Sequence, residues 1–189
     1  MEVYERTLWK AADLHQRAYD HNAWSGAAPD LPVEQLWPGL VQVSDEDQAN
    51  LWGSMTTYGG NVRMPLIDID IPHEWDGQTL RFSNNRGIGN RGYANMNRTF
   101  REVGVTMVPY DNDYRLRFAE PDEVRLVPSS TRGHAHLYVD VPMSKQQELD
   151  LLFELQRNNV VQRGFYEAAR YYGMTFVRPR WAKKGANDF

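Results

Sequence analysis

Two aspartates lie two residues apart in an apolar, strand-like segment. Asp68 and Asp70 alternate with Ile67, Ile69 and Ile71, and successive side chains of a strand point to opposite faces. Both carboxylates are therefore expected on one face, about 7 Å apart. Such a pair is repulsive unless a cation lies between its members, and it suits Mg²⁺ or Mn²⁺. A strand with one solvated face would show the same alternation.

A second segment, 134–141, has the same two-faced pattern. Alternation places its apolar side chains on a core face, and it places on the other face His134, His136, Tyr138 and Asp140. The turn before it contains Ser130, Arg132 and Gly133. Small hydroxyl residues, an arginine and a glycine before a strand can bind phosphate through backbone amides and the guanidinium. An ordinary turn is the alternative interpretation.

Positive charge gathers in two other places. Segment 81–101 has no acidic residue, and its arginines are candidate contacts to nucleic-acid phosphates: Arg81, Arg86, Arg91 and Arg98. Tyr93 or Trp75 could stack a base there. The C-terminal tail has further candidate phosphate contacts in Arg178, Arg180, Lys183 and Lys184. A solvated loop and a solvated terminus are the alternatives.

Composition sets the limits within which these residues act. The 189 residues, 41% of them hydrophobic, can bury a core of their own. With no cysteine, a disulfide framework, a thiolate metal site and a cysteine nucleophile are excluded. No apolar run is long enough to span a membrane, and no signal or transit peptide pattern opens the chain. We therefore expect a cytoplasmic protein, in the host cytoplasm if the protein is viral.

Helices and strands alternate along the rest of the chain. Composition and capping patterns predict helices at about 2–20, 44–55, 94–102 and 144–158. β-branched and apolar runs predict strands at 62–72, 103–109, 123–128 and 134–141, and two short strands joined at Tyr172 and Gly173. The order favours an α+β fold with a mixed, largely antiparallel sheet flanked by helices. Residues 1–43 are expected to be a helical and irregular appendage, and residues 44–189 a single core domain with a basic tail.

The combination of these motifs resembles the archaeo-eukaryotic primase superfamily, the primase-polymerases. The acid pair is in PLIDIDIP, the serine and histidine motif is SSTRGHAHLY with Ser130 and His136, and FVRPRWAKKG resembles the later basic element with Arg178 and Lys183 or Lys184. The resemblance covers about residues 62–184. The GHxHLYxD strand and TFxRP tail are also similar to those of uncharacterised small proteins of actinobacterial viruses.

This resemblance implies an RRM-like core and a divalent-metal-dependent nucleotidyltransferase acting on nucleotides and single-stranded or primed nucleic acid. Asp68 and Asp70 would bind Mg²⁺ or Mn²⁺, and the third acid would be Asp140 or Glu167. His136 and the turn from Ser130 to Gly133 would contact the phosphates, as would Arg178 and Lys183. In-line phosphoryl transfer needs chiefly positioning and charge neutralisation.

Two other classes of function compete with this one. The first is a non-catalytic viral module that keeps the primase-like fold and binds nucleic acid, a nucleotide or a host protein. The second is a cupin-like metal enzyme, because His134, His136 and Asp140 have the spacing of a His-x-His and acid ligand strand. No later glycine and histidine complete the cupin pattern.

Overall fold

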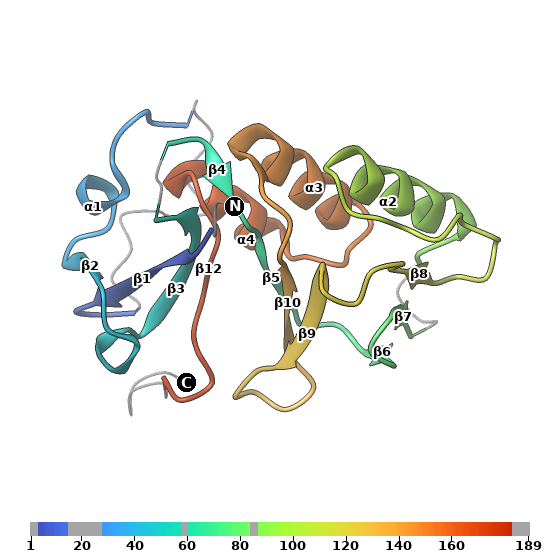
Figure 1. Cartoon of the computed structure of the whole chain (residues 1–189), viewed down its shortest axis with the longest axis horizontal. Helices are drawn as coiled ribbons and strands as arrows, with labels where there is room; N and C mark the ends of the chain where they lie inside the picture. Colours follow the sequence, from blue (N-terminus) through green and yellow to red (C-terminus); the bar gives the residue numbers. More distant parts are fainter. Residues whose placement is uncertain (1–3, 15–27, 58–59, 84–86, 183–189) are drawn as a thin grey trace.

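The computed structural model describes residues 4–14, 28–57, 60–83 and 87–182. Within these ranges the chain has the predicted α+β class: helices pack against sheets whose strand pairs are antiparallel (Figure 1). Arg86, Lys183 and Lys184, which were predicted to contact phosphates, lie outside the described residues. No helix in these ranges is long and apolar enough to cross a membrane.

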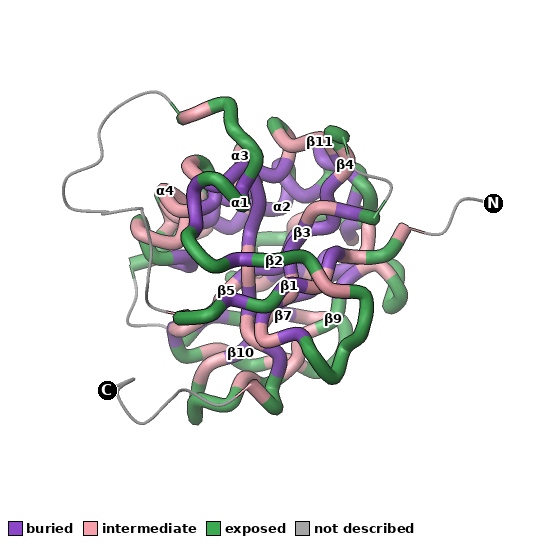
Figure 2. Tube along the Cα trace, turned by 90° about the vertical axis from the view of Figure 1, so that its left-hand side faces the viewer, coloured by how far each residue is buried: buried purple, intermediate pink, exposed green. Residues whose placement is uncertain are grey.

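The first sheet contains the N-terminal strand. Its order is β11 (Met143–Ser144), β4 (Val62–Arg63), β3 (Leu51–Thr56), β1 (Arg6–Ala11) and β2 (Leu40–Val43), and β12 (Phe176–Val177) also pairs with β3. Figure 2 shows the side of the molecule on which β1 and β2 lie, and the middle residues of β2 are exposed there. The short helix α1 (Val33–Leu36) precedes β2. Segments from both ends of the chain thus meet in one sheet.

The helix predicted for residues 2–20 is wrong where the structure describes it. Residues 6–11 form β1, which pairs with β2 on one side and β3 on the other. Thr7, Trp9 and Ala11 are buried at every second position, a period of two that the helix-forming composition of the segment hides. The neighbouring strands complete the backbone hydrogen bonds of β1, so tertiary pairing overrides local propensity.

The helix predicted for residues 44–55 is also wrong. Asp45 does cap a helical turn, accepting from the Asp47 backbone amide, but the turn is only the 3-10 segment η1 (Glu46–Gln48). Strand β3 then begins at Leu51. Gly53 lies so close to β1 that a Cβ atom there would be 2.6 Å from Trp9 Nε1. Close packing of β3 on β1 therefore requires the glycine.

The second sheet joins the two segments predicted to hold the site. Its order is β5 (Leu66–Ile69), β10 (Ala135–Val139) and β9 (Val124–Pro128), which confirms the strands predicted at 123–128 and 134–141. The single strand predicted at 62–72 is instead two strands, β4 in the first sheet and β5 in the second. One face carries Ile67, Ile69 and Leu137 into the main core. Helices α2 (Asn90–Glu102) and α3 (Lys145–Arg157) contribute to the same core.

Among the remaining helices and strands, the structure confirms some of the predictions and contradicts others. Helix α2 is confirmed, as is α3, which begins with the predicted capping box of Ser144 and Gln147. The first of the two short strands predicted near the C-terminus is wrong, because this segment forms helix α4 (Arg163–Tyr172). Gly173, whose φ is 79°, caps the C-terminal end of this helix. Segment 103–109 makes only an isolated bridge from Met107 to Phe118. A third sheet consists of β6 (His73–Trp75), β7 (Thr79–Phe82) and β8 (Leu116–Arg117).

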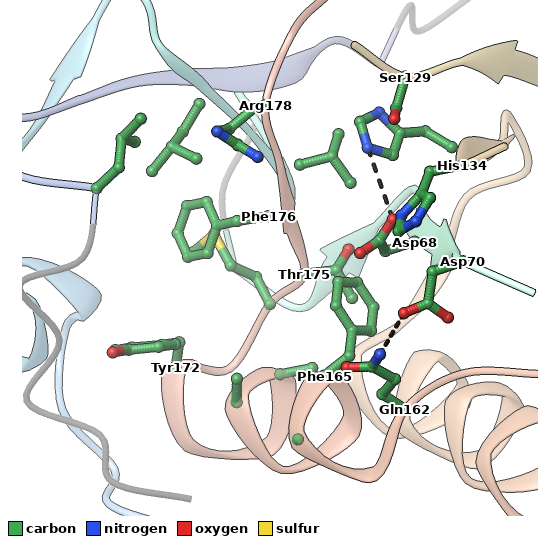
Figure 3. Close-up of a pocket in the computed structure, with 18 of the residues that line it drawn as sticks. Asp68, Asp70, Ser129, His134, Gln162, Phe165, Tyr172, Thr175, Phe176 and Arg178 are labelled. Carbon is green, nitrogen blue, oxygen red and sulfur yellow. Dashed lines mark hydrogen bonds and ion pairs between the residues drawn. The ribbon is translucent and has the colours of Figure 1, made fainter. Parts of the chain in front are cut away.

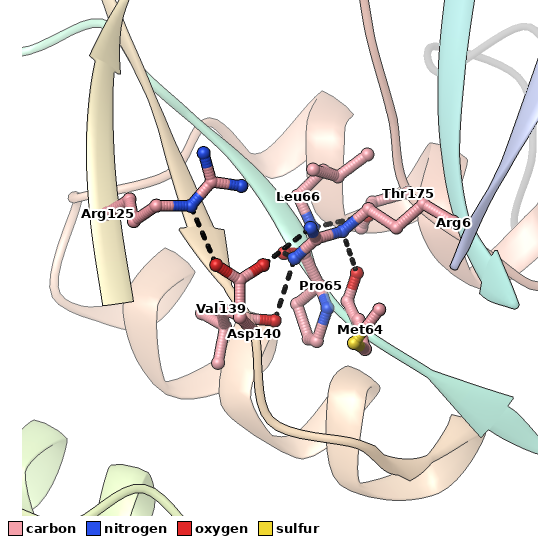
Figure 4. Close-up of polar contacts among 8 residues, drawn as sticks. All are labelled: Arg6, Met64, Pro65, Leu66, Arg125, Val139, Asp140 and Thr175. Atoms are coloured by element: carbon pink, nitrogen blue, oxygen red, sulfur yellow. Dashed lines mark hydrogen bonds and ion pairs between the residues drawn. The ribbon is translucent and has the colours of Figure 1, made fainter. Parts of the chain in front are cut away.

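Arg6 joins the first sheet to the second (Figure 4). Its Nε donates to the Met64 carbonyl at 2.9 Å, and its terminal nitrogens donate to Asp140 Oδ1 at 2.6 Å and to the Val139 carbonyl at 2.8 Å. Arg125 Nε binds the other oxygen of Asp140 at 2.7 Å. Both guanidinium groups also lie over the Tyr138 ring, 5.3 and 4.8 Å from its centre. This Arg6–Asp140–Arg125 cluster fixes how β1 lies against β10.

Candidate active site

A pocket of about 500 Å³ lies between the second sheet, α4 and β12. Figure 3 shows Asp68, Asp70 and His134 at one end of the pocket, the polar end, and Tyr172 and Phe176 at the other, the aromatic end. His136 lies beside Asp68, Trp37 lies beside Tyr172 and Phe176, and Ser130 and Arg178 also line the pocket. The pocket therefore brings the predicted acid pair and histidine together, beside aromatic residues that come from elsewhere in the chain.

Asp68 and His136 are direct partners on neighbouring strands. The register pairs Asp68 of β5 with His136 of β10, and His136 Nε2 is 3.8 Å from Asp68 Oδ1. Burial lowers the pKa of His136 to about 4. Electrostatic interactions with Arg178 and His134 also lower this pKa. At neutral pH the imidazole is therefore uncharged. The contact is neither an ion pair nor, at this length, a hydrogen bond.

Asp70 lies on the same face of the strand segment as Asp68. Its Oδ2 accepts a hydrogen bond from Gln162 Nε2 (Figure 3), and Gln162 is the residue that precedes α4. Ile67 and Ile69 on the opposite face are fully buried, as the alternation predicts. The strand therefore presents two carboxylates to the pocket, and helix α4 positions one of them.

The turn before β10 is closed by its own hydrogen bonds. The Ser129 amide donates to the His134 carbonyl, and the Thr131 amide donates to Ser129 Oγ at 3.1 Å. Ser129, Ser130 and Thr131 line the pocket. Gly133 has a φ of 79°, a conformation that glycine adopts without strain. The turn thus places hydroxyl groups beside His136.

The predicted phosphate contacts are only partly brought together. Ser130, His136 and Arg178 line the pocket, whereas Arg132 and Gly133 are exposed in the turn and are not among the residues that line it. Arg178 follows β12 directly and lies near His136, since its charge contributes to the lowered pKa of that histidine. The pocket therefore has one described cation at its polar end.

Neither candidate for a third acid lines the pocket. Each oxygen of Asp140 is bound by an arginine, Arg6 or Arg125, at the other end of β10 from the pocket. Glu167 pairs with Arg163 one turn earlier on α4, at 2.7 Å. The prediction that Asp140 shares a metal site with Asp68 and Asp70 therefore does not fit the geometry, because its charge is already matched.

Asp68 and Asp70 could bind magnesium only together with ligands that the protein does not itself supply. Within the described residues, no group of three or more histidine, aspartate and glutamate side chains is close enough to hold a metal ion. Mg²⁺, however, is usually bound by one or two carboxylates together with waters and the phosphates of a ligand. Asp68 and Asp70 fit that arrangement, and the fit requires a phosphate ligand in the pocket.

Arg81, Arg91 and Arg98, the described members of the predicted arginine set in segment 81–101, are not among the residues that line the pocket. Arg91 and Arg98 are exposed on α2, and Arg98 lies 3.9 Å from Glu102. Arg81 of β7 contacts the Asp113 carbonyl. Tyr93 is buried and its hydroxyl accepts from the Phe82 amide, so it is not available to stack a base. Trp75 packs on Phe118, with ring centres 6.0 Å apart.

The aromatic end was missed by sequence reasoning. Tyr172 was placed at the joint between two short strands and is instead the last residue of α4, while Trp37 and Phe176 had no predicted role. Trp37 lies just after α1, and Phe176 begins β12. No motif connects three residues so far apart in the chain, so only their convergence identifies them. No family model, curated protein or solved structure matches this chain.

Proposed function

We propose that the pocket binds a nucleoside triphosphate with Mg²⁺ or Mn²⁺ and that the protein is a primase-polymerase-like nucleotidyltransferase. One observation carries the proposal: Asp68, Asp70 and His136 meet at the end of one pocket that also contains hydroxyl groups and Arg178. The motifs that resemble the archaeo-eukaryotic primases are thus the residues that converge. An RRM-like arrangement of the core belongs to the same proposal.

Each group at the polar end has a part in this chemistry. Asp68 and Asp70 would hold the ion against the phosphates, and the ion would neutralise charge on the triphosphate. The neutral imidazole of His136 can donate a hydrogen bond to a phosphate oxygen without attracting a second anion. Arg178 supplies a fixed positive charge that matches phosphate. Gln162 orients the Asp70 carboxylate.

The second candidate is a module that binds a nucleotide and does not transfer it. The position of Asp140 favours it, because the Arg6–Asp140–Arg125 cluster removes the nearest candidate for a third acid from the pocket. Two carboxylates can bind a metal nucleotide, whereas activation of an attacking hydroxyl needs a further base or ion. The two candidates share one ligand and differ in turnover.

The experiment that tests the proposal measures nucleotide incorporation. Purified protein is incubated with labelled nucleotides, primed or unprimed single-stranded DNA or RNA, and Mg²⁺ or Mn²⁺. We expect metal-dependent products that the Asp68→Asn/Asp70→Asn variant loses by about 100-fold or more, the scale on which such charge-stabilising groups act. The control is Asp30→Asn/Asp122→Asn, which makes the same charge change at two exposed aspartates outside the pocket.

The outcomes separate the two candidates. Product formation that needs Asp68 and Asp70, but not Asp30 and Asp122, supports the transferase. If no product forms while metal-dependent nucleotide binding still needs the acid pair, the protein is the non-catalytic module. The absence of both product and nucleotide binding contradicts both candidates.

A further inference from the structure

A second pocket, of about 320 Å³, adjoins the first at Asp70. Asp70 and Gln162 line both pockets, and they are hydrogen-bonded to each other (Figure 3). The other residues that line the second pocket are Ile71, Gln156, Asn159, Val161 and Arg163. They come from the segment after β5, the end of α3 and the segment that leads into α4. One member of the acid pair therefore lies where two pockets meet.

The second pocket combines buried apolar residues with accessible amides. Ile71 and Val161 are 8% and 2% exposed, whereas Asn159 is exposed and Gln156 is half-buried. The described hydrogen bonds of Gln156 and Asn159 are made by their backbone groups, so the two side-chain amides are available to a ligand. An amide side chain both donates and accepts hydrogen bonds. This pair therefore matches the hydroxyl and ring oxygens of a sugar.

Arg163 brings positive charge to the same pocket. Its Nε donates to Glu167 Oε1 at 2.7 Å, and 80% of the side chain remains exposed. A guanidinium has five N–H donors, so one that binds a carboxylate through Nε can also bind a phosphate. The second pocket thus has partners for both polar parts of a sugar phosphate.

The proposed transfer needs an acceptor as well as a nucleoside triphosphate. The 3′ oxygen of the acceptor forms a bond to the α-phosphorus while the bond from that phosphorus to pyrophosphate breaks. Pyrophosphate leaves with the bonding electron pair, and the hydroxyl proton passes to water. The attacking and leaving oxygens lie roughly in line, so the acceptor must approach from the side opposite the pyrophosphate. His136 and Arg178, the proposed phosphate contacts, line the first pocket and are absent from the second, which leaves the second pocket to the acceptor.

We infer that the second pocket holds the sugar and phosphate of the 3′-terminal nucleotide of an acceptor strand. Gln156 and Asn159 bind the sugar, and Arg163 contacts the phosphate. The base stays outside the pocket and is free to pair with a template. A volume of about 320 Å³, at the lower end of small-molecule sites, suits a sugar phosphate. This assignment rests on the proposed transfer and extends it, because Asp70 then lies between the acceptor and the bound triphosphate.

The test measures acceptor binding apart from transfer. Wild type and Gln156→Ala/Asn159→Gly are titrated into a fluorescently labelled primer annealed to a template, without nucleotide or divalent metal, and anisotropy gives the Kd. We expect the variant to bind the primer roughly 10-fold more weakly, since it loses about two hydrogen bonds. Its calorimetric affinity for a nucleoside triphosphate with Mg²⁺ should be unchanged. In the transfer assay, KM for the primer should rise and KM for the nucleotide should not.

The two substitutions are compatible with the backbone. Asn159 has a φ of 60°, which glycine adopts without strain, and alanine favours the helix at Gln156. The matched control is Gln146→Ala/Asn112→Gly, which changes another glutamine of α3 and another asparagine with positive φ, both exposed and outside the two pockets. The control should leave both affinities unchanged. Thermal melting of each variant shows that the compared proteins are folded.

Two further measurements address the phosphate contact and the separation of the sites. Arg163→Gln should reduce the slope of log affinity for the primer against log salt concentration by about 0.7 to 0.9, the value of one phosphate contact. Primer should also bind to wild type that is saturated with an α,β-methylene nucleoside triphosphate, which cannot be transferred. Competition between the two ligands would place them in one site and overturn the inference.

The remaining outcomes distinguish the acceptor site from the function on which it rests. Primer affinity unchanged in Gln156→Ala/Asn159→Gly overturns the acceptor site and leaves the nucleotide site standing. An equal loss of primer and triphosphate affinity also overturns it, because the second pocket would then belong to the nucleotide site. Primer binding that needs Gln156 and Asn159, in a protein that binds no triphosphate, supports the strand-binding pocket and contradicts the proposed function.

Discussion

Asp68 and Asp140 belong to neighbouring strand segments of one sheet and have opposite surroundings. Asp140 is held between Arg6 and Arg125, with a guanidinium on each oxygen. Asp68 faces His136, which is uncharged at neutral pH because its pKa is about 4. The first carboxylate is neutralised by the protein itself, whereas the second lies in a pocket beside another acid, Asp70.

The difference shows that an alternating pattern determines on which face of a strand an acidic side chain lies. The pattern does not determine whether that acid has a structural or a ligand-binding role. Both aspartates have the same local sequence design of acid and apolar residue. Arg6, which decides the role of Asp140, is 134 residues away and arrives on a strand of the other sheet. The two acids should therefore respond differently to mutation, one in stability and the other in ligand binding.

The largest effect is expected at the Arg6–Asp140–Arg125 cluster. Asp140→Ala leaves the buried charge of Arg6 without its carboxylate, and breaking such a pair costs about 3 kcal/mol or more of the free energy of unfolding. Urea denaturation measures the loss. Asp122→Ala, at an exposed aspartate, should cost less than about 0.5 kcal/mol.

A second variant sharpens this result. In Arg6→Met/Asp140→Leu the buried charge of Arg6 and the partly buried charge of Asp140 are both replaced by apolar side chains, and most of the lost stability should return, because a buried pair is stabilising mainly relative to a broken one. A double variant as unstable as Asp140→Ala would mean that the backbone contacts of Arg6 to Met64 and Val139, and not the charge balance, hold the sheets together.

An intermediate effect is expected from the pH dependence of His136. Its folded pKa of about 4 lies below the ordinary value of 6.5, so between these values the unfolded chain binds a proton that the folded chain does not. The contribution of His136 to stability therefore falls as pH falls from 6.5 to 4, by about 3 kcal/mol in all. His136→Gln should remove this part of the pH dependence.

The measurement is urea denaturation of wild type and His136→Gln at several pH values across this window. The difference between the two proteins isolates His136, because other titrating groups are common to both. An NMR titration of the imidazole gives an independent value. A midpoint near 6.5 would show that Asp68 holds a proton on His136, and the contrast between the two acids would then disappear.

The smallest effect on stability is expected at the acid pair itself. Asp68→Asn relieves the repulsion between two carboxylates, and the contact of Asp68 with the uncharged His136 is not an ion pair at neutral pH, so the free energy of unfolding should change by less than about 1 kcal/mol. Urea denaturation at pH 7 without divalent metal tests this. A loss above about 2 kcal/mol would show that Asp68, like Asp140, has a structural role.

The sequence predicted the elements whose local pattern agrees with their tertiary environment. The alternation in β5 and β10 and the capping box of α3 are local signals, and the structure confirms them. Strand β1 and helix α4 were assigned to the wrong class. In β1 the helix-forming composition is overridden by two partner strands, and in α4 the aromatic residues favour a strand locally but pack against Trp37 as a helix.

The candidate site also has features that the sequence predicted and features that only the structure revealed. The sequence by itself determined that Asp68 and Asp70 share a face, because side chains alternate along any strand, and it singled out His136. Only the tertiary structure paired Asp68 with His136, added Trp37 and Phe176 to the pocket, and assigned Asp140 to Arg6. The physical reason is that alternation is a local property of the backbone, whereas charge balance and ring packing depend on contacts between distant segments.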